Sequence, residues 1–203
     1  MLITAIEPRR KSLRALYLDG EFAVNVDAQT LLASRFQLGA EITDEELHEL
    51  LLASDANRAK EKALYLIAHR DHSKKELVDK IKRTASAEAA QKAADRMEEI
   101  GLIDDEDFAR RYAAELFHRK GYARKRVEYE LSQKGIDPDL IEELADELEP
   151  DPLEQINHLI ARKYSAALAD EKGRRRTIAA LQRLGFRWED IRQALKEFEL
   201  SEE

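Results

Sequence analysis

The 203-residue sequence has no cysteine, few glycines and no long apolar run. Without thiols the chain can form neither a disulfide nor a thiolate metal site, and this composition permits a reducing compartment. No apolar run approaches the ~20 residues that cross a bilayer, and residues 1–12 lack the apolar segment of a signal peptide. We therefore expect a cytoplasmic protein that has no membrane partner.

The sequence also offers little that suggests catalysis. The seven glycines form no phosphate-binding loop. The acidic residues 104–107 are typical of a first helical turn, and His69 and His72 lack the spacing of a zinc protease. We expect both histidines to be exposed at a helix end. We predict that the protein is not an enzyme and has no catalytic residues, no metal and no cofactor.

Charge is abundant but unevenly distributed. Charged residues make up 37% of the chain, against about 25% in average globular proteins, and the net charge is −8. Residues 137–154 contain nine acidic and no basic residues, whereas residues 172–187 contain six basic and no acidic residues. The acidic average therefore does not exclude local contact with an anionic partner.

A pattern of residues recurs with a period of 50. Basic clusters stand at positions 74–75, 124–126 and 174–176, and a short helical pattern follows each of them. A fixed period of this size is typical of stacked structural repeats, which need their neighbours to complete a core. In each copy two residues four apart share one helix face: Leu77 and Ile81, Val127 and Leu131, and more weakly Thr177 and Leu181.

The first part of the chain has a different pattern. Residues 2–6, 13–18 and 21–26 are typical of strands, and Asp19-Gly20 predicts a hairpin between the second and the third. Asp27 can cap a short helix, and Thr43-Asp44-Glu45-Glu46 is a capping box that opens another. We predict that this module and its last helix end near residue 54, and that a separate helix then begins the first repeat.

The rest of the chain is predicted to be helical. The third helix of the first repeat, over residues 87–100, should end at Gly101, and Asp104 or Asp105 can cap the next helix. Four aromatic residues lie in helical apolar patterns, so we expect core positions rather than platforms for stacked bases: Phe108, Tyr112, Phe186 and Trp188.

The predicted fold class is mostly α, with three tandem three-helix repeats after a small N-terminal module of β-hairpin or sheet plus helix. The predicted boundaries are 1–54 for the N-terminal module and 55–103, 104–152 and 153–203 for the three repeats.

Four motifs occur at characteristic spacings: GLIDDEDFA at 101–109, ELVDKI at 76–81, KGI at 134–136 and LGF at 184–186. Together they resemble the RecX regulatory proteins of bacteria, although Thr84-Ala85 stands where a Lys-Gly pair is expected in that family. The resemblance covers roughly residues 58–200 and implies an elongated, curved array of three three-helix repeats. It also implies binding in the groove of the RecA filament on DNA, where ATP hydrolysis and strand exchange are restrained during recombination, DNA repair and the SOS response. We expect a monomer.

The basic clusters are the candidate contact residues: Lys74, Lys75, Arg124, Lys125, Arg126, Arg174, Arg175 and Arg176. At helix N-termini, such side chains and the first-turn amides can together hold a phosphate or a partner carboxylate. Alternatively, these side chains are solvated or pair with residues 137–154 of the same molecule. Two functions stay open: a modulator of the RecA filament that meets single-stranded DNA directly or through the filament, and a general single-stranded nucleic-acid-binding helical repeat.

Overall fold

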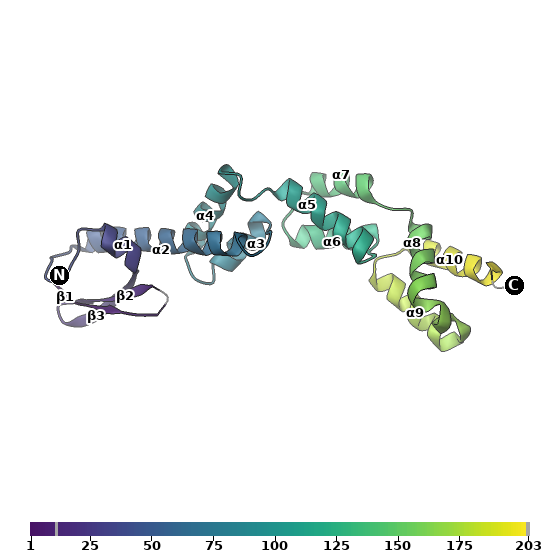
Figure 1. Cartoon of the computed structure of the whole chain (residues 1–203), viewed down its shortest axis with the longest axis horizontal. Helices are drawn as coiled ribbons and strands as arrows, with labels where there is room; N and C mark the ends of the chain where they lie inside the picture. Colours follow the sequence, from purple (N-terminus) through teal and green to yellow (C-terminus); the bar gives the residue numbers. More distant parts are fainter. Residues whose placement is uncertain (11, 202–203) are drawn as a thin grey trace. The chain divides into compact units, whose positions relative to one another are not determined.

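The structure, a computed structural model, describes residues 1–10 and 12–201. It forms two compact units, Met1–Ile103 (unit 1) and Asp104–Glu203 (unit 2), which are drawn in Figure 1. Most described residues are helical, and one three-stranded sheet lies in unit 1, so the predicted fold class is confirmed. Within the described residues, no helix combines the length and the apolar character needed to cross a membrane.

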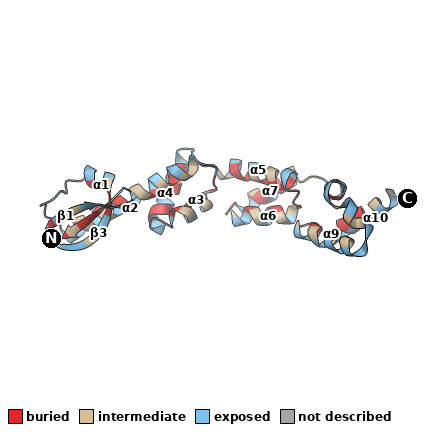
Figure 2. Ribbon diagram, turned by 60° about the horizontal axis from the view of Figure 1, so that its bottom comes forward, coloured by how far each residue is buried: buried red, intermediate tan, exposed pale blue. Residues whose placement is uncertain are grey.

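The sheet of unit 1 is antiparallel and has the strand order β1-β2-β3, with β1 at Ile3–Pro8, β2 at Leu13–Leu18 and β3 at Glu21–Asp27. Asp19 and Gly20 join β2 to β3 with φ of 52° and 92°, the left-handed backbone that the predicted hairpin requires. One face of the sheet is buried, and Ile3, Leu16 and Val26 lie in its core (Figure 2).

The caps predicted at three helix starts are confirmed. Asp27 caps α1 (Ala28–Ala33), Thr43 and Glu46 form the capping box of α2 (Asp44–Ile67), and Asp104 caps α5 (Asp105–Ala114). Each cap satisfies first-turn amides with a side chain two or three residues away. Because these contacts are local in sequence, sequence analysis could locate them.

Helix α2 corrects the expectation of separate helices on the two sides of residue 54. It is one continuous helix of 24 residues. The polar residues near its middle do not end it, because they contact the sheet: Ser54 Oγ accepts a hydrogen bond from Asp27 N (2.7 Å), and Asn57 Nδ2 donates one to the Asp27 carboxylate (2.9 Å). The N-terminal module and the first repeat thus share this helix, and the division of the chain at residues 54, 103 and 152 stays a prediction.

The first repeat is completed by α3 (Lys74–Ile81) and α4 (Ala87–Glu99), which pack on α2. After α4, Gly101 adopts the predicted left-handed conformation, with φ of 71°. The core of this repeat is rich in small side chains, because it contains the buried alanines Ala59, Ala63, Ala89, Ala90, Ala93 and Ala94. Small residues let the three helices approach one another closely, which suits a thin structural repeat.

Unit 2 contains two further three-helix repeats. The first comprises α5, its π-helical extension η1 (Glu115–Arg119), α6 (Arg124–Gln133) and α7 (Pro138–Leu148). The other comprises α8 (Pro152–Leu159), the π-helical η2 (Ile160–Tyr164), the 3-10 helix η3 (Ser165–Ala169), α9 (Glu171–Arg183) and α10 (Trp188–Ser201). In sequence order, we call the three-helix repeats of the chain repeats 1, 2 and 3. The residue pairs that recur every 50 positions are all buried: Leu77, Ile81, Val127, Leu131, Thr177 and Leu181.

The turn between the second and third helices differs among the repeats. Gly135 and Gly185 make this turn in repeats 2 and 3 with φ of 78° and 98°. In repeat 1 the aligned position is Ala85, which has no positive φ. The third helices of the repeats also differ in spacing: α7 begins 51 residues after α4, whereas α10 begins 50 residues after α7. Alanine adopts the left-handed conformation only at a cost, so the first repeat has a turn that is one residue shorter.

The expectation for the aromatic residues is only partly right. Phe108 and Phe186 are buried in the cores of repeats 2 and 3, and Tyr112 packs against the core of repeat 2. Trp188 is 48% exposed, so its predicted core position is wrong. It is the first residue of α10, and the buried stripe of that helix begins one turn later, at Ile191.

His72 is buried, which corrects the expectation that both histidines are exposed, whereas His69 is exposed as expected. The Lys80 ammonium donates to His72 Nε2 (2.8 Å), so His72 Nδ1 carries the proton and donates to the Arg70 carbonyl (2.8 Å). Burial lowers the pKa of His72, and the positive charges of Arg70 and Lys80 add to this effect, whereas the hydrogen bond to the Arg70 carbonyl and the charge of Glu76 oppose it.

We expect the free energy of unfolding to fall as the pH drops below about 6.5, the ordinary pKa of histidine in an unfolded chain. Protonation of His72 is easier in the unfolded chain, so its contribution is fully present above that pH and is lost as the pH falls toward the folded-state pKa. Denaturant titrations between pH 7.5 and 5.5 should show a shallower decline for His72→Gln than for the original protein. Equal profiles for His72→Gln and the original protein would contradict the assignment.

Candidate interaction site

The first residue of each basic cluster pairs with carboxylates on the third helix of its own repeat. Lys74 Nζ lies 2.7 Å from both Asp95 and Glu98 of α4. Arg124 Nη1 lies 2.5 Å from Asp146 and 3.4 Å from Glu149, both near the end of α7. Arg174 pairs with Glu199 of α10. Allowing for the shorter turn in repeat 1, Glu98, Glu149 and Glu199 are equivalent positions, so a clip between the second and third helices recurs in every repeat.

These ion pairs stabilise the charged side chains of the clips. Hydrogen bonds to Asp95 and then Glu98 raise the pKa of Lys74 above its usual value. The pKa of Arg124 is also raised, first by Asp146 and then by Glu128, whose Oε1 accepts from Arg124 Nε at 2.7 Å. The partners of Arg124 at 146 and 149 belong to the acidic residues 137–154, so pairing within the molecule, the alternative interpretation from the sequence, holds for Arg124.

The other cluster residues have varied environments. Arg126 pairs with Glu130 (2.6 Å) and lies over the rings of Tyr122 and Tyr129, 5.6 and 5.4 Å from their centroids. Arg175 pairs with Glu171 one turn away (3.0 Å). The exposed Lys75, Lys125 and Arg176 complete the clusters, and neither Lys125 nor Arg176 has an ion-pair partner among the described residues.

The three clusters do not occupy equivalent places in their helices. Residues 74–75 and 124–126 begin α3 and α6, as predicted. Residues 174–176 lie one turn inside α9, because Asp170 caps that helix and Glu171 begins it. Ser73 and Asp170 cap α3 and α9 with their side chains, whereas α6 follows Ala123, which has no capping side chain. Only the cluster of repeat 2 therefore adjoins first-turn amides that no side chain caps.

Repeats 2 and 3 are held together by contacts that sequence analysis did not predict. Ala123 N donates to the Leu184 carbonyl (2.9 Å), and Gln155 Nε2 donates to the carbonyls of Phe117 (3.0 Å) and Tyr122 (3.3 Å). A Cβ atom on Gly185 would lie 2.8 Å from Arg126 Cβ, so only glycine permits this approach. These contacts join segments more than 30 residues apart, and no local pattern in the sequence signals them.

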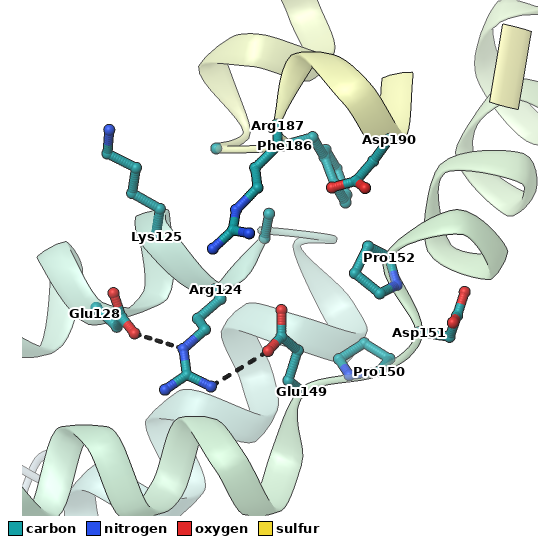
Figure 3. A pocket seen from close by; sticks show the side chains of 12 residues that line it. Arg124, Lys125, Glu128, Glu149, Pro150, Asp151, Pro152, Phe186, Arg187 and Asp190 are labelled. Carbon is teal, nitrogen blue, oxygen red and sulfur yellow. Dashed lines mark hydrogen bonds and ion pairs between the residues drawn. The ribbon is translucent and has the colours of Figure 1, made fainter. Parts of the chain in front are cut away.

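A hollow of about 750 Å³ lies at this junction, and we call it the junction hollow (Figure 3). Arg187 reaches into it from the turn before α10, toward the backbone end of the Arg124 side chain, while Lys125 points away from Arg124 on the next position of α6. Arg187 is exposed and has no ion-pair partner among the described residues. The other charged lining residues are acidic: Glu128, Glu149, Asp151 and Asp190.

The charges of the junction hollow suit a partner that carries both signs. Arg124 is neutralised by its own carboxylate partners. Lys125 and Arg187 are therefore the cations of the junction hollow that have no ion-pair partner within the described residues, and they lie beside the exposed Asp151. Sequence analysis counted Arg187 among the basic residues 172–187 but did not select it, because it lies outside the 50-residue pattern. Among the residues that the structure describes, no group of three histidine or acidic side chains is arranged to hold a metal ion.

Comparison with known proteins gives consistent matches. Residues 104–144 match a family model described as the second three-helix domain of RecX, and residues 149–195 match the third. The regulatory protein RecX of Caldanaerobacter subterraneus subsp. tengcongensis is 30% identical over 199 residues, which cover 96% of this chain and 98% of that protein. The regulatory protein RecX of Bacillus subtilis is 26% identical over 203 residues, which cover 97% of this chain and 77% of that protein.

Two crystal structures are similar in fold. One of a regulatory protein RecX has a TM-score of 0.62 and 20% identity, and the match covers 97% of this chain and 98% of that one. Another, of RecX from Lactobacillus salivarius, has a TM-score of 0.58 and 21% identity, with 73% of this chain and 99% of that one covered.

Proposed function

Because this chain belongs to the RecX family of regulatory proteins, we propose that it binds the filament that RecA forms on DNA and restrains ATP hydrolysis and strand exchange there. The observation that carries this proposal is the match to a regulatory protein RecX over nearly the whole length of both chains. The partner follows from the resemblance of the motifs in repeats 1 to 3, and the role is inhibitory.

The electrostatics of Lys74 and Arg124 favour a structural role rather than catalysis. Catalytic acids and bases usually have pKa values shifted toward the working pH. At Lys74 and Arg124 the pKa moves in the opposite direction, further above neutral pH, because each side chain is held by carboxylates in the same repeat. These groups are suited to holding helices together. The junction hollow, with Lys125 and Arg187 at its edge, is the surface that we assign to the filament.

A protein surface fits the junction hollow better than a bare nucleic acid does. A phosphate backbone is uniformly negative, whereas the hollow presents four carboxylates next to its cations. A partner with alternating charges can pair with both. The general nucleic-acid-binding function is therefore the weaker candidate for the helical repeats, since Arg124, Arg126, Arg174 and Arg175 already have carboxylate partners.

The test is the ATPase activity of RecA on single-stranded DNA, titrated with this protein. We expect the double variant Lys125→Ala/Arg187→Ala to need about tenfold more protein for equal inhibition, because it removes two unpaired cations from the contact surface. Arg162→Ala/Lys163→Ala is the matched control: it removes the same charge from exposed positions of η2 outside the junction hollow, and it should inhibit like the original protein.

Three outcomes would count against the proposal. If the original protein leaves the ATPase unchanged, the function is wrong; if both double variants inhibit equally well, the assigned surface is wrong. If the protein binds bare single-stranded DNA as tightly as the filament, with a log-log salt slope of about −0.7 per phosphate contacted, the general nucleic-acid-binding function is favoured.

A further inference from the structure

The face of the N-terminal sheet opposite its core carries a different set of side chains. Along β2 and β3, Leu16 and Val26 point into the core, while Tyr17 and Asn25 lie on the other face and are at least partly exposed. A hollow of about 550 Å³ lies on this second face; Arg9 and Arg10 line it together with Leu13, Tyr17, Phe22 and Asn25. The name of the relatives, regulatory protein RecX, assigns no function to this face of the sheet.

Two aromatic rings stand side by side on this face. Tyr17 and Phe22 are cross-strand partners, and their ring centroids are 5.9 Å apart at an interplanar angle of 75°. In this edge-to-face pair, the Phe22 side chain stays 52% exposed. Burying a phenylalanine ring is worth about 1.5–3 kcal/mol, so leaving it at the surface sacrifices stability. A ring that stays exposed beside another aromatic residue is available for stacking.

The cations of this face are held next to the rings. Arg9 Nη2 donates to the Tyr17 hydroxyl (3.2 Å), and that hydroxyl donates to Glu7 Oε2 (3.0 Å). The chain of contacts from Glu7 to Arg9 fixes the tyrosine and the guanidinium group relative to one another. Arg10 is exposed and has no ion-pair partner among the described residues. Two arginines and two aromatic residues, Tyr17 and Phe22, thus line the same hollow.

We propose that this face of the sheet binds single-stranded nucleic acid, with a base stacked on Phe22 and the neighbouring phosphates held by Arg9 and Arg10. Aromatic rings on a β-sheet surface and adjacent cations are the combination that binds unpaired strands in many proteins. A base inside a duplex has both faces stacked on its neighbours, so only an unpaired strand can present a free base face to Phe22. Because every base has such a face, the site should tolerate any sequence.

The charge of the whole molecule limits the strength of this binding. The net charge of −8 repels a polyanion at long range, and Glu7 lies 3.7 Å from Arg9 within the site itself. Binding should therefore be weak and best seen at low ionic strength, where the local attraction to Arg9 and Arg10 is least screened. The site lies in unit 1, whereas the junction hollow lies in unit 2, so it adds a second contact to the proposed function without depending on it.

The experiment compares two fluorescent oligomers of equal length and charge, oligothymidine and an abasic strand, by anisotropy with the full chain at low salt. The original protein should bind oligothymidine about tenfold more tightly, because stacking requires the base. Phe22→Leu keeps an apolar side chain but removes the ring, and it should lose most of this preference; Phe22→Trp should retain it. Arg9→Ala/Arg10→Ala should weaken both complexes and reduce the log-log salt slope by about 1.4.

One further variant tests the effect of the negative charge beside Arg9. Glu7→Gln keeps an acceptor for the Tyr17 hydroxyl but removes a negative charge beside Arg9, so it should strengthen binding of both oligomers. Equal affinity of the original protein for the two oligomers would overturn the proposal, and so would an unchanged preference in Phe22→Leu. If Phe22→Leu instead loses inhibition of RecA while neither oligomer binds the original protein, the face contacts a protein and the proposal is wrong.

Discussion

Gly185→Ala should lower the free energy of unfolding by about 3 kcal/mol. Its φ of 98° lies in the left-handed region, where a Cβ atom costs about 1–2 kcal/mol. The new Cβ would also lie 2.8 Å from Arg126 Cβ and 3.0 Å from Arg126 N, so repeats 2 and 3 would have to move apart, at a further cost of about 1–3 kcal/mol. Chemical denaturation followed by circular dichroism measures this loss.

Gly101→Ala is the matched control for this prediction. Gly101 ends α4 as Gly185 ends α9: in both turns the glycine N–H bonds the carbonyl three residues back, and the next N–H bonds the carbonyl five residues back. The φ of Gly101 is 71°, and nothing lies within 4 Å of the position of its Cβ. Gly101→Ala should therefore lower the free energy of unfolding by only about 1 kcal/mol, from backbone strain alone. Equal losses for the two variants would show that the contact with Arg126 is unimportant.

Arg124→Met should lower the free energy of unfolding by about 2 kcal/mol. The substitution keeps much of the apolar stem but leaves Glu128, Asp146 and Glu149 close together without their shared cation. The Arg124 side chain is only 28% exposed, so water replaces the lost contacts incompletely. Denaturant titration at low salt measures the loss, and added salt should reduce it only in part.

Two neighbouring positions test whether this effect comes from the clip. Lys125→Met changes the same charge at an exposed position without an ion-pair partner among the described residues, and it should stay within about 0.5 kcal/mol of the original protein. Arg174→Met removes the equivalent clip of repeat 3, where the side chain is 41% exposed and Glu199 is its only ion-pair partner among the described residues; we expect a loss of about 0.5 kcal/mol. If Lys125→Met is as costly as Arg124→Met, the clip is not the cause.

The clip gives the recurring basic residues a structural role besides the contact that the sequence analysis predicted for them. A cation that recurs every 50 residues suggested a repeated contact with a partner, but at Lys74, Arg124 and Arg174 the recurring partner lies in the same repeat. A repeat architecture preserves what each unit needs for its own packing. The unpaired Arg187, which lies outside the 50-residue pattern, is the more informative candidate for binding.

Sequence by itself determined the features that depend on near neighbours along the chain. The strands, the Asp19-Gly20 hairpin, the helix caps and the buried pairs such as Leu77 and Ile81 follow from preferences and spacings within a few residues. These preferences act between residues that are close together in the sequence, so they can be recognised from the order of the residue types.

Only the tertiary structure decided which distant groups meet. It joined the two helices expected around residue 54 into α2, since Ser54 and Asn57 bind Asp27 of the sheet, and it paired Arg124 with Asp146 and Glu149. It also brought Gly185 against Arg126 and left Phe22 exposed beside Tyr17. Whether a charge is paired or free, and whether a ring is covered, depends on how helices and strands pack, and that packing is set by the whole core rather than by neighbours in the chain.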